Sequence, residues 1–421
     1  MSATSLSLGV LLAMSRVATA DAADDGGRLA SVVAMLKSGE QAVRVVCLGD
    51  SITGVYYHTG GRRAWCDMLG VALGKAYPKA RLEMINAGIS GHTTDAGLGR
   101  IERDVVARKP HLVVVMFGMN DVCNRKPEQF RANLRTIVGC CREAGAAVVL
   151  CTPNSVYPDA GRPMALLGAY AQVVRDVARE RGVPLADCFQ ACEDVRKTDE
   201  TEWMLLMSET IHPAMLGHKL FAEVIARTIS GRAVSLADAT PPDDALLFSL
   251  KRLDAGEPLK VVAMPPYDTL VPDALRQLFP TAKIDVTTWP VEGKSLAEIE
   301  QWAKRIRAMA PHLVVVAVPA AAGAPDAGAF IRSYNDVLNW SIAFEKANWD
   351  LLSILPSVTG PVPATQRDRE ALARRIILGK DYACVERRQG DQRPARELLL
   401  QLITEQKAKQ KAAAGAAKPT P

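Results

Sequence analysis

The stretch VVCLGDSITG, residues 45–54, runs from apolar residues straight into a glycine, an acid and a serine. The continuous apolar run of residues 45–48 is typical of a strand that is buried on both faces of a parallel sheet. In open sheets of this kind, functional groups gather at the carboxyl ends of the strands. The stretch therefore predicts a buried strand that presents Ser51 at the carboxyl edge of a sheet.

Apolar strands alternate with helical patterns from residue 43 onward, and this alternation predicts βαβ units with a parallel sheet and helices on both faces. The strands are expected at residues 43–48, 82–85, 112–117, 147–151 and 184–186. The main helices that follow them are expected at residues 127–144, 163–181 and 213–230.

The same pattern starts again after ATPPDDA, residues 239–245, which has the composition of a linker. PHLVVV occurs at residues 110–115 and again at 311–316, and three further segments match in the same order. These are residues 45–53 with 261–269, 77–83 with 279–285, and 148–156 with 351–359. Matches in a fixed order predict that the second half is a structural repeat of the first.

The composition is that of a globular protein with two domains. The chain has 421 residues, of which 48% are hydrophobic and 23% charged. Much of the net charge of +5 comes from a lysine-rich tail, so the charge does not indicate a nucleic-acid groove. No apolar run reaches the roughly 18 residues that a membrane span needs.

The N-terminus resembles a secretory signal, with an apolar core at residues 6–14 followed by small residues that suit a cleavage site. Against this interpretation, no Lys or Arg precedes the apolar core, and Arg16 follows it. We expect residues 1–23 to act as a signal peptide and the protein to be exported to the periplasm or secreted. Without a functional signal, the protein would be cytoplasmic.

Ser51 needs a base to become a nucleophile and hydrogen-bond donors to stabilise the oxyanion that it forms. Gly91, in NAGISGHTT at residues 86–94, follows the second strand, where glycine lets a backbone N–H approach an anion closely. Asn120 ends the third strand and brings an amide to the same edge. The alternatives are that Asp50, Ser51 or Asn120 caps a helix and that Gly91 belongs to an ordinary turn.

Among the six histidines, His212 is the candidate base. Glu209 lies three residues before it, and a carboxylate at that spacing can hold imidazole Nδ1–H and leave Nε2 to take a proton from serine. His111 and His312 recur with the repeat and are expected to be structural. The other three histidines, His58, His92 and His218, have no such acid and are expected to face packing, loops or solvent.

Together these blocks resemble the SGNH hydrolases, the lipase and acylhydrolase family often called GDSL. The resemblance rests on Gly49-Asp50-Ser51, Gly91, Gly118-Met119-Asn120-Asp121 and Glu209-Thr210-Ile211-His212, which occur in the family's order. It implies a flavodoxin-like three-layer α/β/α sandwich. One departure is Glu209, where the family usually has Asp.

The resemblance also implies roles for individual residues. Ser51 would be the nucleophile and His212 the general base, oriented by Glu209. The oxyanion hole would consist of the backbone N–H groups of Ser51 and Gly91 and the side-chain amide of Asn120. No cofactor is expected, and no His, Cys or Asp cluster has the spacing of a metal site.

The repeat places Pro265-Pro266-Tyr267 opposite the serine block, Ala321 opposite Asn120 and Arg393 opposite His212, and it retains only Gly293, opposite Gly91. The second half is therefore expected to be a degenerate, non-catalytic copy. We expect a hydrolase domain at residues 36–232, a linker at 233–258, the degenerate domain at 259–406 and a disordered tail at 407–421.

The expected function is a serine esterase that acts on short-chain or O-acetyl esters, with carbohydrate esters as the first substrate class. Two alternatives stay open: a non-catalytic protein that binds glycans or acyl groups, and an acyltransferase that uses the same residues. The oligomeric state is not readable from the sequence.

Overall fold

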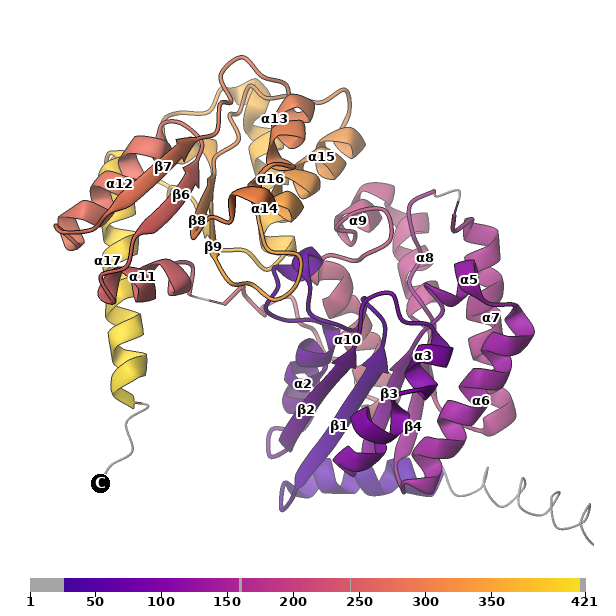
Figure 1. The fold of residues 1–421 in the computed structure, drawn as a ribbon. Helices are drawn as coiled ribbons and strands as arrows, with labels where there is room; N and C mark the ends of the chain where they lie inside the picture. Colours follow the sequence, from indigo (N-terminus) through magenta and orange to yellow (C-terminus); the bar gives the residue numbers. More distant parts are fainter. Residues whose placement is uncertain (1–25, 159–160, 243, 417–421) are drawn as a thin grey trace, which may run out of the picture.

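The computed structural model describes residues 26–158, 161–242 and 244–416; the signal peptide expected at residues 1–23 lies outside these ranges. The described part contains two five-stranded parallel sheets, each in its own α/β domain (Figure 1). Within the same ranges, no helix is both long enough and apolar enough to cross a bilayer. The predicted fold class, an α/β sandwich followed by a second α/β unit, is confirmed.

The first sheet has the strand order β2-β1-β3-β4-β5, which is the flavodoxin-like order. Its strands are β1 Ala42–Gly49, β2 Arg81–Gly88, β3 Leu112–Met116, β4 Ala147–Cys151 and β5 Leu185–Ala186. The helices and 3-10 turns of this domain are η1 Tyr57–Thr59, α2 Trp65–Ala76, α3 Thr94–Leu98, α4 Ile101–Asp104, η2 Val106–Arg108, α5 Asp121–Asn124, α6 Pro127–Glu143, α7 Met164–Arg181, α8 Cys188–Thr198, α9 Glu200–Leu205 and α10 Met215–Ser230.

The central strands of this sheet are more deeply buried than its edge strand. Every residue of β3 and β4 is buried, and so is the carboxyl half of β1, because helices cover both faces of these central strands. β2 lies at the edge and is largely half-exposed. Helices α2 and α10 pack together in one layer, and α3, α6 and α7 pack in the other. The carboxyl ends of β1, β2 and β3 therefore meet at one rigid edge.

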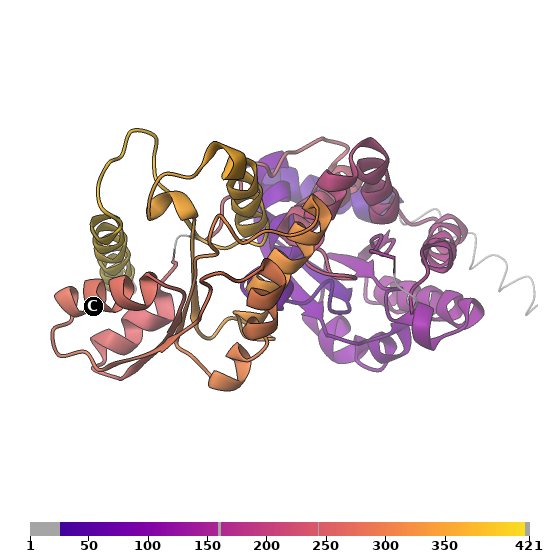
Figure 2. The same cartoon turned by 90° about the horizontal axis from the view of Figure 1, so that it is seen from above.

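The second sheet has the order β7-β6-β8-β9-β10, which is the same order with the strands renumbered. Its strands are β6 Leu259–Ala263, β7 Ile284–Thr288, β8 Leu313–Val316, β9 Asp350–Ile354 and β10 Cys384–Val385. Its helices and 3-10 turns are α11 Leu247–Asp254, α12 Tyr267–Leu278, α13 Leu296–Ala303, α14 Ile306–Met309, α15 Ala327–Trp340, η3 Pro356–Val358, η4 Ala364–Gln366, α16 Arg367–Gly379 and α17 Ala395–Ala416. Helix α15, drawn in orange, packs against α9 of the first domain (Figure 2).

The two sheets also share their register. Val45 of β1 lies opposite Leu112 of β3, and Val261 of β6 lies opposite Leu313 of β8. These are the positions that the sequence matches align. The likeness between the two halves therefore extends to strand order and strand pairing.

The histidines that recur with PHLVVV have the same role in both sheets. His111 Nδ1 accepts a hydrogen bond from the Arg44 N–H at 2.9 Å, and His312 Nδ1 accepts one from the Lys260 N–H at 3.0 Å. Each ring thus ties the start of a central strand to its neighbour. This agrees with the structural role predicted for them.

The expected linker at residues 233–258 differs from the structure at its carboxyl end. Helix α11 lies within it and belongs to the second domain, where Leu250 is buried. The Ser249 N–H and hydroxyl both donate to the buried carboxylate of Asp350 in β9, at 2.6 Å each. The first domain likewise begins before residue 36, because Val32 in a helix over residues 26–38 is buried in its core.

The disorder expected from residue 407 onward is wrong for residues 407–416, which continue α17. Lys407 Nζ lies 3.7 Å from the ring centroid of Phe279 and donates to the Leu278 carbonyl at 3.2 Å. Gln410 donates to the Leu247 carbonyl at 3.1 Å. The composition of residues 407–416 alone indicates a solvated tail. In the structure, their polar side chains contact α11 and the end of α12, and the residues continue α17.

Candidate active site

Ser51 lies in a tight turn directly after β1, at the carboxyl edge of the first sheet. The Asp50 carboxylate accepts a hydrogen bond from the Ile52 N–H at 2.9 Å and so fixes this turn. A Cβ at Gly49 would lie 2.6 Å from the Met116 carbonyl oxygen, so only glycine fits where the chain leaves the strand. The next α-helix begins only after this turn and η1, so Ser51 does not cap it.

The structure brings His212 and Glu209 to Ser51. His212 Nε2 lies 2.8 Å from Ser51 Oγ, and His212 Nδ1 is hydrogen-bonded to Glu209 Oε1. The same carboxylate oxygen accepts the backbone N–H of His212 at 2.8 Å. Burial raises the pKa of Glu209, but its bonds to His212 outweigh that effect and hold the pKa below its ordinary value. Glu209 is therefore ionised and orients the ring.

Gly91 and Asn120 lie at the same sheet edge. Gly91 has a φ of +75°, which favours glycine. Asn120 does not use its side chain as a helix cap; its Nδ2 donates to the His92 carbonyl at 3.1 Å and so lies against the Gly91 loop. Within the described residues, the backbone N–H groups of Ser51 and Gly91 have no hydrogen-bond acceptor. Both donors are thus available to an anion.

Two buried side chains hold these loops in register. The Asp121 carboxylate accepts the Thr94 hydroxyl at 2.6 Å and the Thr94 N–H at 3.0 Å, which joins the Asn120 turn to the start of α3. Arg100 donates to the carbonyls of Ala87 at 2.7 Å and Gly49 at 2.8 Å. Gly49 is the last residue of β1 and Ala87 the last but one of β2, so Arg100 fixes the carboxyl edge itself.

A column of three stacked imidazoles lies beneath the site, which the sequence did not predict. His58 stacks on His212 at 4.7 Å between ring centroids and on His218 at 5.4 Å. His58 Nε2 donates to the Ser51 carbonyl at 3.1 Å. Burial lowers the pKa of His58 far below its ordinary value and that of His218 to about 3. Both rings are neutral, so neither repels a proton on His212.

Three residues of the second domain hold residues 207–212, here called the histidine loop. Asn335 Nδ2 donates to the Met207 carbonyl at 3.2 Å, and Asn339 Nδ2 donates to the Ser208 carbonyl at 3.1 Å. The Ser208 hydroxyl donates to Asn339 Oδ1 at 3.0 Å and accepts from Lys380 Nζ. Lys380 is fully buried, and this burial lowers its pKa to about 7. None of these contacts was predicted.

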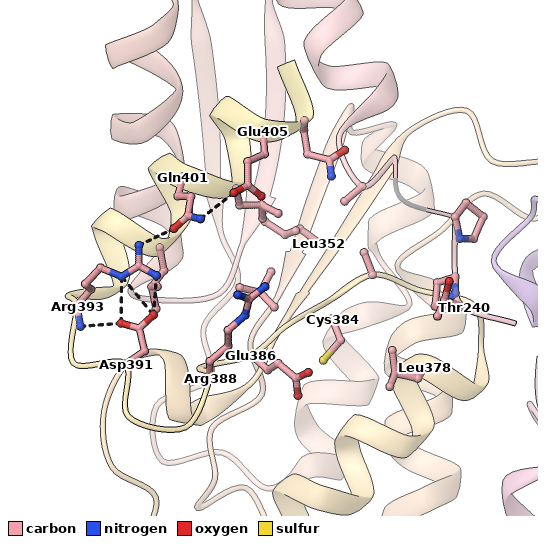
Figure 3. Close-up of a pocket in the computed structure, with 18 residues that line it drawn as sticks. Thr240, Leu352, Leu378, Cys384, Glu386, Arg388, Asp391, Arg393, Gln401 and Glu405 are labelled. Atoms are coloured by element: carbon pink, nitrogen blue, oxygen red, sulfur yellow. Dashed lines mark hydrogen bonds and ion pairs between the residues drawn. The ribbon is translucent and has the colours of Figure 1, made fainter. Parts of the chain in front are cut away.

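The positions that the repeat aligns with the site have other partners in the second domain. Tyr267, opposite Ser51, is buried, and its hydroxyl is hydrogen-bonded to Thr359 Oγ1 at 2.8 Å. Arg393, opposite His212, forms an ion pair with Asp391 and donates to Gln401 (Figure 3). It lines a cavity of about 500 Å³ beside α17. Gly293 keeps the positive φ of its counterpart, +69°.

The arrangement around Ser51 is that of nucleophilic acyl transfer. A hydroxyl, an imidazole and a carboxylate form a hydrogen-bonded series, and two backbone N–H groups and one side-chain amide lie at the same edge of the sheet. Within the part of the chain that the structure describes, no group of three His, Cys, Asp or Glu side chains could hold a metal ion.

Comparison with known proteins agrees with this geometry. The model of the GDSL-like lipase/acylhydrolase family matches residues 47–220. Residues 47–220 are thus similar to that family. An acetylxylan esterase of Geobacillus stearothermophilus is 29% identical over 165 residues, which cover 36% of this chain and 74% of that protein. An arylesterase of Vibrio mimicus is 28% identical over 212 residues, 48% of this chain and 97% of its own.

Among solved structures, the lipase/acylhydrolase of Enterococcus faecalis is 29% identical and covers 46% of this chain and 97% of its own, with a TM-score of 0.39. The family and the esterases among its relatives identify this protein as an enzyme that hydrolyses esters.

Proposed function

We propose that the protein removes short acyl groups, acetyl first, from carbohydrate esters, with Ser51 as nucleophile, His212 as general base and Glu209 as the group that orients His212. The observation that carries this proposal is the unbroken series from Ser51 Oγ through the His212 ring to Glu209. The carbohydrate is suggested by the relative named as an acetylxylan esterase.

These groups act in sequence in the proposed reaction. Ser51 Oγ attacks the ester carbonyl while His212 Nε2 takes its proton, and the resulting imidazolium faces the Glu209 carboxylate. The tetrahedral oxyanion is bound by the N–H groups of Ser51 and Gly91 and by Asn120 Nδ2. His212 then protonates the leaving alcohol. Water, deprotonated by the same ring, releases the acid from the acyl-enzyme.

The test is acetate release from p-nitrophenyl acetate and from acetylated xylan by the intact protein. Release from both supports the proposal. Acetyl transfer to an added sugar, well above hydrolysis, would favour an acyltransferase with the same residues. No turnover of either substrate, together with binding of the glycan, would favour a non-catalytic binding protein.

Replacing Asn120 with alanine is expected to lower kcat by about 10²–10³, because one of three oxyanion donors is lost. KM for p-nitrophenyl acetate should change little, since this bond strengthens only as the oxyanion forms. Asn124→Ala is the matched control: Asn124 is exposed, lies one helical turn further on and donates only to the Asn120 carbonyl at 2.8 Å. Equal kcat in the two variants would remove Asn120 from the oxyanion hole.

For the second half, we propose descent from the same fold with loss of catalysis. The shared strand order and register support this proposal, and so does the engagement of Tyr267 and Arg393 with other partners. Export through residues 1–23 is proposed from the sequence alone, and cleavage of this segment during secretion would test it.

A further inference from the structure

An exposed aromatic side chain of the second domain lies beside the first domain's site. Three large hydrophobic side chains are exposed in the described residues, Val71, Leu166 and Phe344, and Phe344 is the aromatic one, with 50% of its surface accessible. It lies in the segment between α15 and β9, whose backbone bonds to the first domain. The Tyr57 N–H donates to the Phe344 carbonyl at 3.1 Å, so this segment is fixed against the active-site side of the first domain.

Phe344 forms an aromatic ledge with Tyr56 and Tyr57. Its ring centroid lies 6.1 Å from that of Tyr56 and 5.4 Å from that of Tyr57. The ledge has contacts with both parts of the candidate site. The Tyr57 ring lies 6.0 Å from the ring of His212, and the Tyr56 hydroxyl accepts the N–H of Ser90, the residue before Gly91.

The ledge is held rigid from behind by Arg307 of α14. Its guanidinium lies over the rings of Tyr57, Phe344 and Trp340 at 5.2, 5.6 and 4.5 Å. It also donates to the Asn339 carbonyl at 2.7 Å. Arg307 is thus fixed against these rings, while half of the Phe344 surface is still accessible.

We propose that the aromatic ledge binds the alcohol portion of the ester, and that this portion is a ring with an apolar face, either a sugar or an aryl group. The inference rests on the proposed function, in which His212 protonates the leaving alcohol; the alcohol must then lie beside His212, where Tyr57 stands. An aromatic face packs well against the apolar face of a ring and poorly against a short flexible chain. The second domain thus contributes to substrate selection.

The test compares three acetates that share the acyl group: ethyl acetate, phenyl acetate and an acetylated methyl xyloside. Phe344→Ala is expected to raise KM about 5- to 10-fold for the esters with a ring and to leave KM for ethyl acetate unchanged. Phe344→Trp should retain the wild-type values. Leu166→Ala, which removes another exposed hydrophobic side chain, from α7, is the matched control.

The outcomes separate the two proposals. A rise in KM for the xyloside alone identifies a sugar site, and a rise for phenyl acetate alone identifies an aryl site. An unchanged KM for both ring esters, or an equal rise for all three, overturns the ledge while the esterase stands. A wild-type protein that hydrolyses none of the three acetates overturns the proposed function and the ledge with it.

The buried bonds to the histidine loop carry a second inference independently. We infer that Asn339 is a positioning residue, which acts on catalysis through the placement of His212. Asn339 is buried and bonds both the carbonyl and the hydroxyl of Ser208, whose N–H in turn donates to the His212 carbonyl at 2.8 Å. Asn339 of α15 is thus connected to His212 through Ser208, by two hydrogen bonds on one side of Ser208 and one on the other.

Asn339→Leu is expected to lower kcat about 10-fold with KM unchanged, because a small displacement of His212 weakens proton transfer and leaves the substrate's binding surface intact. The matched control is Ser341→Ala, which removes a buried bond of 2.7 Å to the Val337 carbonyl on the same helix but has no bond to the loop. Both variants should lower the melting temperature. Should Asn339→Leu not fold, Asn335→Ala removes the neighbouring bond to Met207. Unchanged kcat in the folded variant would make the contact purely structural.

Discussion

Replacing Ser51 with alanine is expected to lower kcat for p-nitrophenyl acetate by about 10⁶. The Ser51 hydroxyl is hydrogen-bonded to His212 Nε2 at 2.8 Å, so alanine removes the atom that is proposed to form the acyl-enzyme. Alanine should fit without strain, because the turn is fixed by Asp50 and by backbone bonds. The measurement is the steady-state rate together with the melting temperature of each protein.

Tyr267→Phe is the matched control, because Tyr267 occupies the corresponding place after β6. It loses one hydrogen bond to Thr359 and should leave kcat unchanged. Activity lost in Tyr267→Phe and kept in Ser51→Ala would move the esterase to the second domain. Activity that survives both substitutions would mean that hydrolysis occurs elsewhere or belongs to a contaminant.

The sheet edge around Ser51 was predictable because the information lies in short segments. Continuous apolar runs predicted β1, β3 and β4, and these strands are buried throughout their central residues. The glycines and polar residues directly after the strands then had to lie at one edge. The spacing of Glu209 and His212 is local too, because a turn of four residues brings them together.

The contacts from the second domain were not predictable in this way. Lys380 is fully buried, although lysine is usually exposed, and its partner Ser208 lies 172 positions away in the chain. In the sequence, Asn339 is one polar residue among several in an amphipathic helical pattern, and nothing marks it as a contact of the active site. His58 has no acid near it in sequence, and its importance arises from stacking between two other rings. Only the packing of distant segments reveals such roles.

Glu209→Gln is expected to lower kcat by about 10⁴, which is the second largest effect, although the side chain keeps its shape. If the amide oxygen faces His212, the negative charge that stabilises the imidazolium is lost. If the amide nitrogen faces it, a donor meets Nδ1 and holds the ring in the tautomer that cannot accept the serine proton. Either orientation impairs the base, so the measurement is kcat for p-nitrophenyl acetate across the pH range in which the protein is folded.

Glu209→Asp separates the charge from the reach of the side chain. Aspartate is the residue usual in this family, but it is one methylene shorter, and here the carboxylate must reach both the ring and the backbone N–H of His212. We expect kcat to fall about 10-fold, far less than in Glu209→Gln, because the charge is kept while the bond to the ring is lengthened. If both variants retain wild-type activity, the carboxylate serves only to close the turn, and His212 must be oriented by its stacking on His58 and by the loop that Asn339 holds.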